Sequence, residues 1–264
     1  MPLKDVKTLK EVETWGYQLQ NIKPAQIART SYDLVVVDYA SDDGAFSQAQ
    51  VDQMKHKPDG SRRLVISYMS IGEAETYRPY WNKEWKKQPP AWLGKENREW
   101  RGNYAVRFWE PEWQNIIFDY ADKIVSAGFD GVCLDKVDEF EEMGHEQEMI
   151  EFVRRISSRV KTKRPDFLVI SQNGDALLAN KQFRDVIAAF AREDLFLGED
   201  DDGKPNKPAS IKESIARLKL LAAEGKPVLV VEYPRNNQQG EQVRRDIAAL
   251  GFIGHTTGRD LDKV

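Results

Sequence analysis

The stretch of sequence that decides the fold is GFDGVCLDKVD at residues 128–138. Gly128 follows a helical stretch and ends it, and the apolar run 131–134 is short enough to be a buried strand. The run ends in Asp135, an acid placed directly after the buried residues. A helix stop, a short buried strand and a polar strand end, in that order, form one unit of a parallel α/β protein.

Seven further runs of β-branched or aromatic residues lie around this unit, with helical stretches between them. Several of the runs are continuously apolar, as expected of strands that contact helices on one side and a barrel core on the other. The predicted strands are Tyr17–Leu19, Leu34–Tyr39, Leu64–Ser70, Gly131–Asp135, Leu168–Gln172, Ile187–Ala191, Val228–Tyr233 and Phe252–His255. The clearest predicted helices are Glu112–Ala127, Gln147–Lys163, Ser210–Glu224 and Glu241–Leu250.

This alternation predicts an α/β fold, a single (β/α)8 TIM barrel that occupies residues 1–264 as one domain. Eight successive strands fit a closed barrel better than an open sheet, and the 264 residues match the roughly 250 that one barrel needs. Two long segments, Gly72–Glu110 and Glu193–Pro208, interrupt the alternation. We expect both to lie as long loops over the C-terminal mouth, where barrel enzymes carry their active sites.

Charge and hydropathy exclude several classes of partner. The formal net charge is −4 at pH 7, which argues against nucleic acid because phosphate recognition needs a basic face. No run approaches the roughly 18 apolar residues of a membrane span, and the first residues lack the apolar core of a signal peptide. We therefore expect a monomer with no membrane span, located in the cytoplasm or, if a signal was removed, in the cell envelope or outside the cell.

Acids collect at the carboxyl ends of the predicted strands. Because those ends meet at one mouth in a barrel, we expect the acids to converge there. Carboxylates that lie close together raise one another's pKa, so one can stay protonated as an acid while another stays ionised. The alternative for each acid is that it caps a helix or pairs with a basic neighbour. The five strand-end acids are Asp38, Glu73, Asp135, Glu193 and Glu232.

Aromatic residues are concentrated in the first long segment, where six of the seven tryptophans fall between Trp81 and Trp113. Sugars present flat C–H faces that stack on aromatic rings, so exposed aromatics at a barrel mouth predict saccharide subsites. The alternative is that the rings pack the segment onto the barrel, and we expect both. The predicted substrate contacts are Tyr39, Tyr68, Tyr77, Trp81, Trp109 and Tyr233, together with Asp38, Glu73, Asp138 and Glu232.

Other chemistries find little support. Cys133 is the only cysteine and lies in a predicted buried strand, so it reads as a small core residue rather than a nucleophile. The three histidines are scattered, without the spacing of a zinc site. We therefore expect no cofactor and no metal, although carboxylates alone at the mouth leave a Ca²⁺ or Mg²⁺ site open.

Several motifs together resemble glycoside hydrolase family 114, which includes endo-α-1,4-polygalactosaminidases. They are WGYQL at 15–19, VDY at 37–39, SYMSIGEAE at 67–75, GFDGVCLD at 128–135 and VEY at 231–233. The resemblance runs from Trp15 to about Gly254. It implies a TIM-like barrel in which Asp135 is the nucleophile and Glu193 the acid/base. Asp194 is the alternative to Glu193, and many such proteins carry a secretion signal.

The residues and the resemblance together predict a glycoside hydrolase that acts within a polysaccharide, such as α-1,4-linked galactosamine, with retention of anomeric configuration. An amino sugar would suit the negative potential expected from acids at the mouth. The chemistry predicts a higher pKa for Glu193 than for Asp135. The alternatives are a catalytically silent carbohydrate-binding barrel and a metal-dependent sugar-processing enzyme. The acids expected to crowd the mouth are Glu73, Glu75, Asp138, Glu139, Glu199, Asp200 and Asp201.

Overall fold

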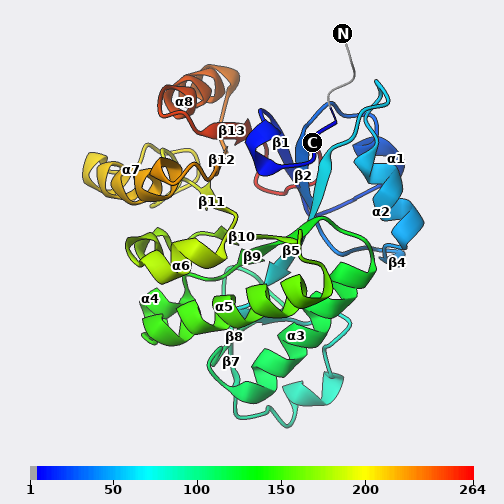
Figure 1. Ribbon diagram of the computed structural model, residues 1–264. Helices are drawn as coiled ribbons and strands as arrows, with labels where there is room; N and C mark the ends of the chain where they lie inside the picture. The colour runs from blue at the N-terminus through cyan, green and yellow to red at the C-terminus, as the bar shows by residue number, and fades with distance from the viewer. Residues whose placement is uncertain (1–4) are drawn as a thin grey trace.

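The computed structural model describes residues 5–264, and its centre is a sheet of eight parallel strands that curls into a nearly closed barrel (Figure 1). Trp15 closes the barrel, because its indole nitrogen donates to the Ile253 carbonyl oxygen at 3.0 Å across the seam between the first and last strands. The strands lie in chain order: β1 (Trp15–Gln18), β2 (Leu34–Val37), β5 (Leu64–Ser70), β9 (Gly131–Asp135), β10 (Leu168–Gln172), β11 (Ala189–Glu193), β12 (Val228–Glu232) and β13 (Ile253–Thr256).

Helices surround this barrel (Figure 1). α3 shows how sequence sets their bounds, because it begins with a proline at its first turn and ends just before Gly128, whose φ of +90° favours glycine. The helices are α1 (Pro24–Ile27), α2 (Gln48–Lys55), α3 (Pro111–Ser126), α4 (Glu139–Met143), α5 (Glu146–Lys163), α6 (Lys181–Val186), α7 (Pro208–Ala223) and α8 (Asn237–Ala249). Short 3-10 helices cover Leu9–Glu11, Lys83–Lys86 and Asp175–Ala179.

The continuous apolar runs are explained by two separate layers of core. In β2, Leu34 and Val36 point into the barrel interior, whereas Val35 and Val37 pack under the helices. Cys133 is fully buried in the interior layer, as a small core residue. Both faces of a strand are thus buried, which is why the strands do not alternate between apolar and polar residues. No helix among residues 5–264 is long and apolar enough to cross a membrane.

The segment after β5 is more ordered than a long loop. It contains an antiparallel sheet in the order β6 (Glu73–Glu75), β8 (Asn103–Val106) and β7 (Leu93–Glu96). A hairpin of β3 (Ala40–Ser41) and β4 (Gly44–Ala45) follows β2 at the same end of the barrel. Both additions follow the carboxyl ends of barrel strands, so they build the wall of the mouth.

One boundary difference bears on the site. The sixth barrel strand was predicted at Ile187–Ala191 but is observed at Ala189–Glu193. Glu193 therefore lies within the strand, as its last residue, rather than in the loop that follows.

Candidate active site

The carboxyl ends of the barrel strands open into a cavity of about 960 Å³. Asp135, at the end of β9, and Glu193, at the end of β11, both line it. Their strands flank β10, so they are separated by one strand around the barrel. Six of the predicted substrate contacts also line the cavity: Asp38, Tyr68, Glu73, Tyr77, Asp138 and Tyr233.

Gln172, the last residue of β10, lies between the two acids. Its side-chain nitrogen Nε2 is 3.2 Å from Asp135 Oδ1 and 2.9 Å from Glu193 Oε2. Because both oxygens contact one nitrogen, they are at most about 6.1 Å apart, which is the sum of the two distances. The same nitrogen lies 3.1 Å from the Tyr17 hydroxyl. Neither Gln172 nor Tyr17 was predicted from the sequence, although Gln172 is a polar strand end of the same kind as the acids.

The other partners of the two acids are also neutral. The Tyr68 hydroxyl donates to Asp135 Oδ2 at 2.7 Å. The Tyr233 hydroxyl donates to Glu193 Oε1, and Asn173 Nδ2 donates to Glu193 Oε2 at 3.0 Å. Within residues 5–264, neither acid forms an ion pair with a lysine, arginine or histidine. The pair is thus held in place without its charge being compensated by direct contact.

Burial without a cation raises the pKa of both acids. Desolvation, together with the charges of Glu193 and Asp138, raises the pKa of Asp135 to about 7. Desolvation also raises the pKa of Glu193, while the hydrogen bonds from Tyr233 and Asn173 lower it. The higher pKa expected for Glu193 than for Asp135 stays a prediction. Carboxyls this close ionise as a coupled pair, so one member can hold a proton while the other is ionised.

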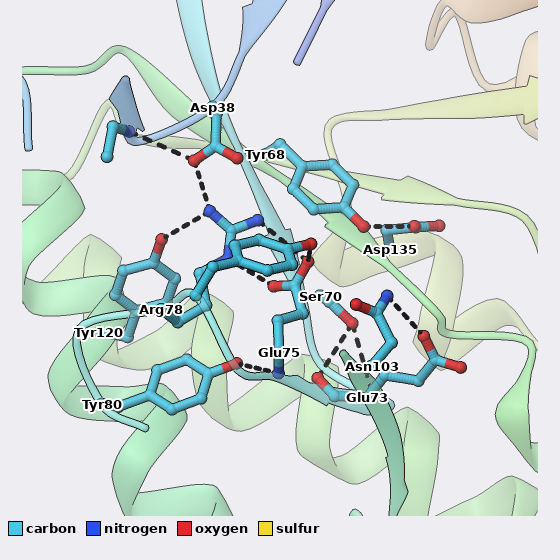
Figure 2. A network of polar contacts seen from close by, with 12 residues as sticks. Asp38, Tyr68, Ser70, Glu73, Glu75, Arg78, Tyr80, Asn103, Tyr120 and Asp135 are labelled. Atoms are coloured by element: carbon cyan, nitrogen blue, oxygen red, sulfur yellow. Dashed lines mark hydrogen bonds and ion pairs between the residues drawn. The ribbon is translucent and has the colours of Figure 1, made fainter. Parts of the chain in front are cut away.

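Two of the other three strand-end acids, Asp38 and Glu73, pair with cations. Asp38 pairs with Arg78, which also pairs with Glu75 at 2.5 Å (Figure 2). Glu73 accepts hydrogen bonds from Asn97 and Asn103 and pairs with Lys136 at 3.5 Å.

Glu232 was predicted as a substrate contact, and its position corrects that prediction. It is fully buried, does not line the cavity, and accepts hydrogen bonds from the backbone nitrogens of Phe196 and Leu197 at 2.7 and 3.2 Å. A strand-end acid can thus be used to fix the loop that follows the neighbouring strand.

Asp194, the alternative to Glu193, faces another partner. Its φ is +53°, and both of its carboxyl oxygens bind the guanidinium of Arg259 at 2.9 and 3.1 Å. Asp194 does not line the cavity, whereas Arg259 does. The guanidinium of Arg259 also lies 4.2 Å from the ring centre of Tyr233, the residue that donates to Glu193. Arg259 belongs to the C-terminal segment, which returns to the end of β1, where Leu19 donates to the Leu261 carbonyl oxygen (Figure 1).

Three of the predicted aromatic contacts do not line the cavity, so their subsite role is corrected. The Tyr39 ring packs edge-on against Tyr120 at 5.3 Å, and Trp109 stacks on His145 at 3.8 Å. Trp81 packs against Trp85 at 5.3 Å within a cluster of rings that includes the fully buried Trp92 and Trp113. Most of this aromatic segment therefore packs the insertion onto the barrel. Trp100, which was not predicted as a substrate contact, does line the cavity.

The acidic residues divide in a similar way. Glu73, Glu75 and Asp138 line the cavity, as expected. The remaining acids of that group do not: Glu139, Glu199, Asp200 and Asp201. Eight acidic and four basic side chains line the cavity in all, so its formal charge is negative. No cluster of three or more histidine, cysteine or acidic side chains among residues 5–264 could hold a metal ion.

Comparison with known proteins places this site in a family. The model of glycoside-hydrolase family GH114 matches residues 3–264. The chain belongs to glycoside hydrolase family GH114. The resemblance seen in the motifs is therefore confirmed.

Relatives and solved structures agree with this assignment. The chain is 43% identical over 235 residues to an uncharacterized protein of Methanocaldococcus jannaschii, with 83% of this chain and 66% of that protein covered. The glycoside hydrolase domain of PelA from Pseudomonas aeruginosa has a similar fold, with a TM-score of 0.75, 16% identity and coverage of 96% and 97% of the two chains. Ega3 from Aspergillus fumigatus, solved in complex with galactosamine, has a TM-score of 0.74, 16% identity and coverage of 100% and 97%. These structures share the TIM-barrel fold of this GH114 member.

Proposed function

We propose that this protein hydrolyses glycosidic bonds within a polysaccharide and that Asp135 and Glu193 carry out the chemistry. The observation that carries the proposal is the acid pair. The buried Asp135 and the partly buried Glu193 line one cavity, contact the same amide nitrogen and form no ion pair with any cation among residues 5–264. Glycosidases use two such carboxyls, one that transfers a proton and one that acts on the sugar ring.

The spacing of the pair favours retention of anomeric configuration. Retaining enzymes place their carboxyls about 5–5.5 Å apart, whereas inverting enzymes leave about 6.5–9.5 Å so that a water molecule fits between them. The oxygens held by Gln172 lie at most about 6.1 Å apart. That limit is shorter than the inverting range, so direct attack by a carboxylate is the mechanism we infer.

In the first step, the Asp135 carboxylate forms a bond to the anomeric carbon while the bond to the leaving oxygen breaks. Glu193 donates its proton to that oxygen. In the second step, the Glu193 carboxylate takes a proton from water as the water oxygen attacks the anomeric carbon, and Asp135 is released. The raised pKa of both acids favours a state with one ionised and one protonated carboxyl, as this sequence of steps needs.

A polymer of amino sugars fits the charge of the cavity. The excess of acidic over basic lining residues favours a cationic substrate. Asp138 is one of the acids that line the cavity. We infer that α-1,4-linked galactosamine is the substrate, with ammonium groups facing these acids. The galactosamine complex of Ega3 supports this choice by analogy.

The test is digestion of a panel of polysaccharides, with new reducing ends as the readout. Deacetylated galactosamine polymer should be cleaved, its fully acetylated form should be cleaved less, and polygalacturonate should resist. Asp135→Asn and Glu193→Gln should each abolish the release. Preference for the anionic polymer would reject the substrate, and undiminished cleavage by both variants would reject the site. Binding of the polymer without cleavage would instead indicate a carbohydrate-binding barrel, and loss of activity in EDTA would indicate a metal-dependent enzyme.

A further inference from the structure

Tyr77 combines an exposed ring with an anchored hydroxyl. The residue is 63% exposed and lines the cavity. Its hydroxyl donates to Glu75 Oε1 at 2.5 Å, and the guanidinium of Arg78 lies over the ring, 4.9 Å from its centre. Both partners are buried. The ring is therefore fixed from one side by buried groups while it remains open to solvent in the cavity.

The groups that hold Tyr77 are themselves held firmly. Arg78 donates to both carboxyl oxygens of Glu75, at 2.5 and 3.1 Å, and also to Asp38 (Figure 2). The Glu75 backbone nitrogen donates to the Tyr80 hydroxyl at 3.1 Å (Figure 2). An exposed tyrosine ordinarily samples several side-chain rotamers, and ordering it on binding costs free energy. This network removes much of that cost in advance, as a preorganised binding surface does.

Trp100 lies on the same wall of the cavity. It is 53% exposed, in the turn between β7 and β8, and lines the cavity with Tyr77. The turn is tied to the residue before Tyr77, because the Thr76 nitrogen donates to the Gly102 carbonyl oxygen at 2.8 Å. Within the turn, the Trp100 backbone nitrogen donates a hydrogen bond to Asn97 Oδ1 at 3.3 Å. The two exposed rings are therefore mounted on neighbouring, hydrogen-bonded parts of one insertion.

The exposure of the Tyr77 and Trp100 rings is unusual for this molecule. Only three large hydrophobic residues in the described part of the chain are strongly exposed, and the third, Leu220, lies on α7 and does not line the cavity. The other aromatic residues of the insertion, such as Trp92, are packed inside. Exposed aromatics that gather on one rim of a binding cavity mark an interaction site rather than a random surface.

We propose that Tyr77 and Trp100 form a distal saccharide subsite, on which sugar units of the substrate stack away from the bond that is cleaved. The proposal rests on the proposed function, since it takes the occupant to be the same polysaccharide. Asp135 and Glu193 receive their hydrogen bonds from other residues, Tyr68, Gln172, Asn173 and Tyr233. The subsite therefore contributes binding of long chains and leaves the chemical step unchanged.

The test compares KM and kcat for galactosamine oligosaccharides of increasing length, from the disaccharide to the decasaccharide. Tyr77→Ala and Trp100→Ala should each raise KM for the longest chains by about five- to tenfold, because each variant loses one aromatic contact with the sugar. kcat should stay unchanged. KM for the shortest cleaved chains should stay as in the wild type. Leu220→Ala is the matched control, an exposed hydrophobic residue removed elsewhere, and should change neither constant. Tyr77→Phe keeps the ring over Arg78 and should lose less affinity than Tyr77→Ala.

The outcomes separate the subsite from the activity. All variants should melt near the wild-type temperature, because both side chains are exposed. If the wild type cleaves the oligosaccharides and the alanine variants show the same dependence of KM on chain length, the subsite is rejected and the proposed function stands. If neither cleavage nor binding of any oligosaccharide is detected with the wild type, both are rejected.

Discussion

Two groups of buried or partly buried acids lie at the same mouth of the barrel and differ in their partners. In the described part of the chain, Asp135 and Glu193 contact only neutral donors, whereas Asp38 and Glu75 share the guanidinium of Arg78. Both groups sit at or just beyond the carboxyl ends of barrel strands. Position in the fold therefore brings acids to the mouth, and the nearest cation determines which of them remain free to exchange a proton or to attack a substrate.

A raised pKa alone does not identify the reactive acids. Burial raises the pKa of Glu232 to about 8, above that of Asp135, but Glu232 is sealed from the cavity by backbone contacts. Burial also raises the pKa of Glu139 to about 7, although that acid pairs with Lys136. The acid pair is distinguished because it combines a raised pKa, access to the cavity and, within residues 5–264, the absence of a direct cationic partner.

The largest expected effect separates the two groups by activity. Asp135→Asn should lower kcat by a factor of about 10⁴ or more, because an amide cannot form the bond to the anomeric carbon. Asp38→Asn should keep a kcat within about tenfold of the wild type, since Asp38 is paired with Arg78 and takes no part in the chemical steps. The measurement is the initial rate at saturating polymer for both folded variants. Equal losses of kcat in the two variants would contradict the distinction between the two groups of acids.

The second effect concerns stability. Arg78→Met should destabilise the fold by about 3–5 kcal/mol, because it leaves Asp38 and Glu75 buried without their cation. Burial already raises the folded-state pKa of Asp38, and loss of the Arg78 charge would raise it further above the unfolded value. Stability is therefore retained at low pH, where Asp38 is protonated, and is lost as the pH rises through the folded-state pKa of Asp38. Urea unfolding from pH 4 to pH 8 is the measurement, and a pH-independent loss would contradict the role given to Arg78.

A smaller effect is expected from Arg259, which lies beyond the acid pair. The charge of Arg259 lowers the pKa of Glu193, so Arg259→Gln should raise it. The rate falls at high pH when the pair loses its last proton, and this alkaline limb should move to higher pH by less than about one unit, because Arg259 is partly exposed to solvent. The measurement is the pH dependence of kcat/KM. Arg259→Lys, which keeps the charge, should shift the limb less, and a shift to lower pH would contradict the account.

Much of the barrel could be predicted because its strands carry their own signals. β2 and β12 are continuous apolar runs, and α3 ends at a glycine stop. The sheet of β6, β8 and β7 was missed because β7, the sequence LGKE, is mostly exposed and has no apolar pattern. α2 was missed because it has only eight residues and its start depends on a local contact between Ser47 and Gln50.

The site could be predicted in part, because a strand-end acid is visible in the sequence and its partner is not. Asp38 and Arg78 lie 40 positions apart, and only the fold brings them together. The direction of a side chain is hidden in the same way. Tyr39 and Tyr77 both follow barrel strands, yet Tyr39 packs into the core and Tyr77 opens into the cavity. The same holds for the donor Asn173, whose hydrogen bond lowers the pKa of Glu193 and which no motif had indicated.

The central claim is that Asp135 attacks the sugar and Glu193 exchanges the proton, and one measurement tests it directly. The Glu193→Gln variant is incubated with an aryl galactosaminide whose leaving group needs no protonation, and its peptides are examined by mass spectrometry. Without the base that activates water, the covalent intermediate should accumulate, so the account predicts one galactosaminyl group on the peptide that contains Asp135. A label on any other carboxyl, or continued turnover with no label and inversion at the anomeric carbon, would contradict it.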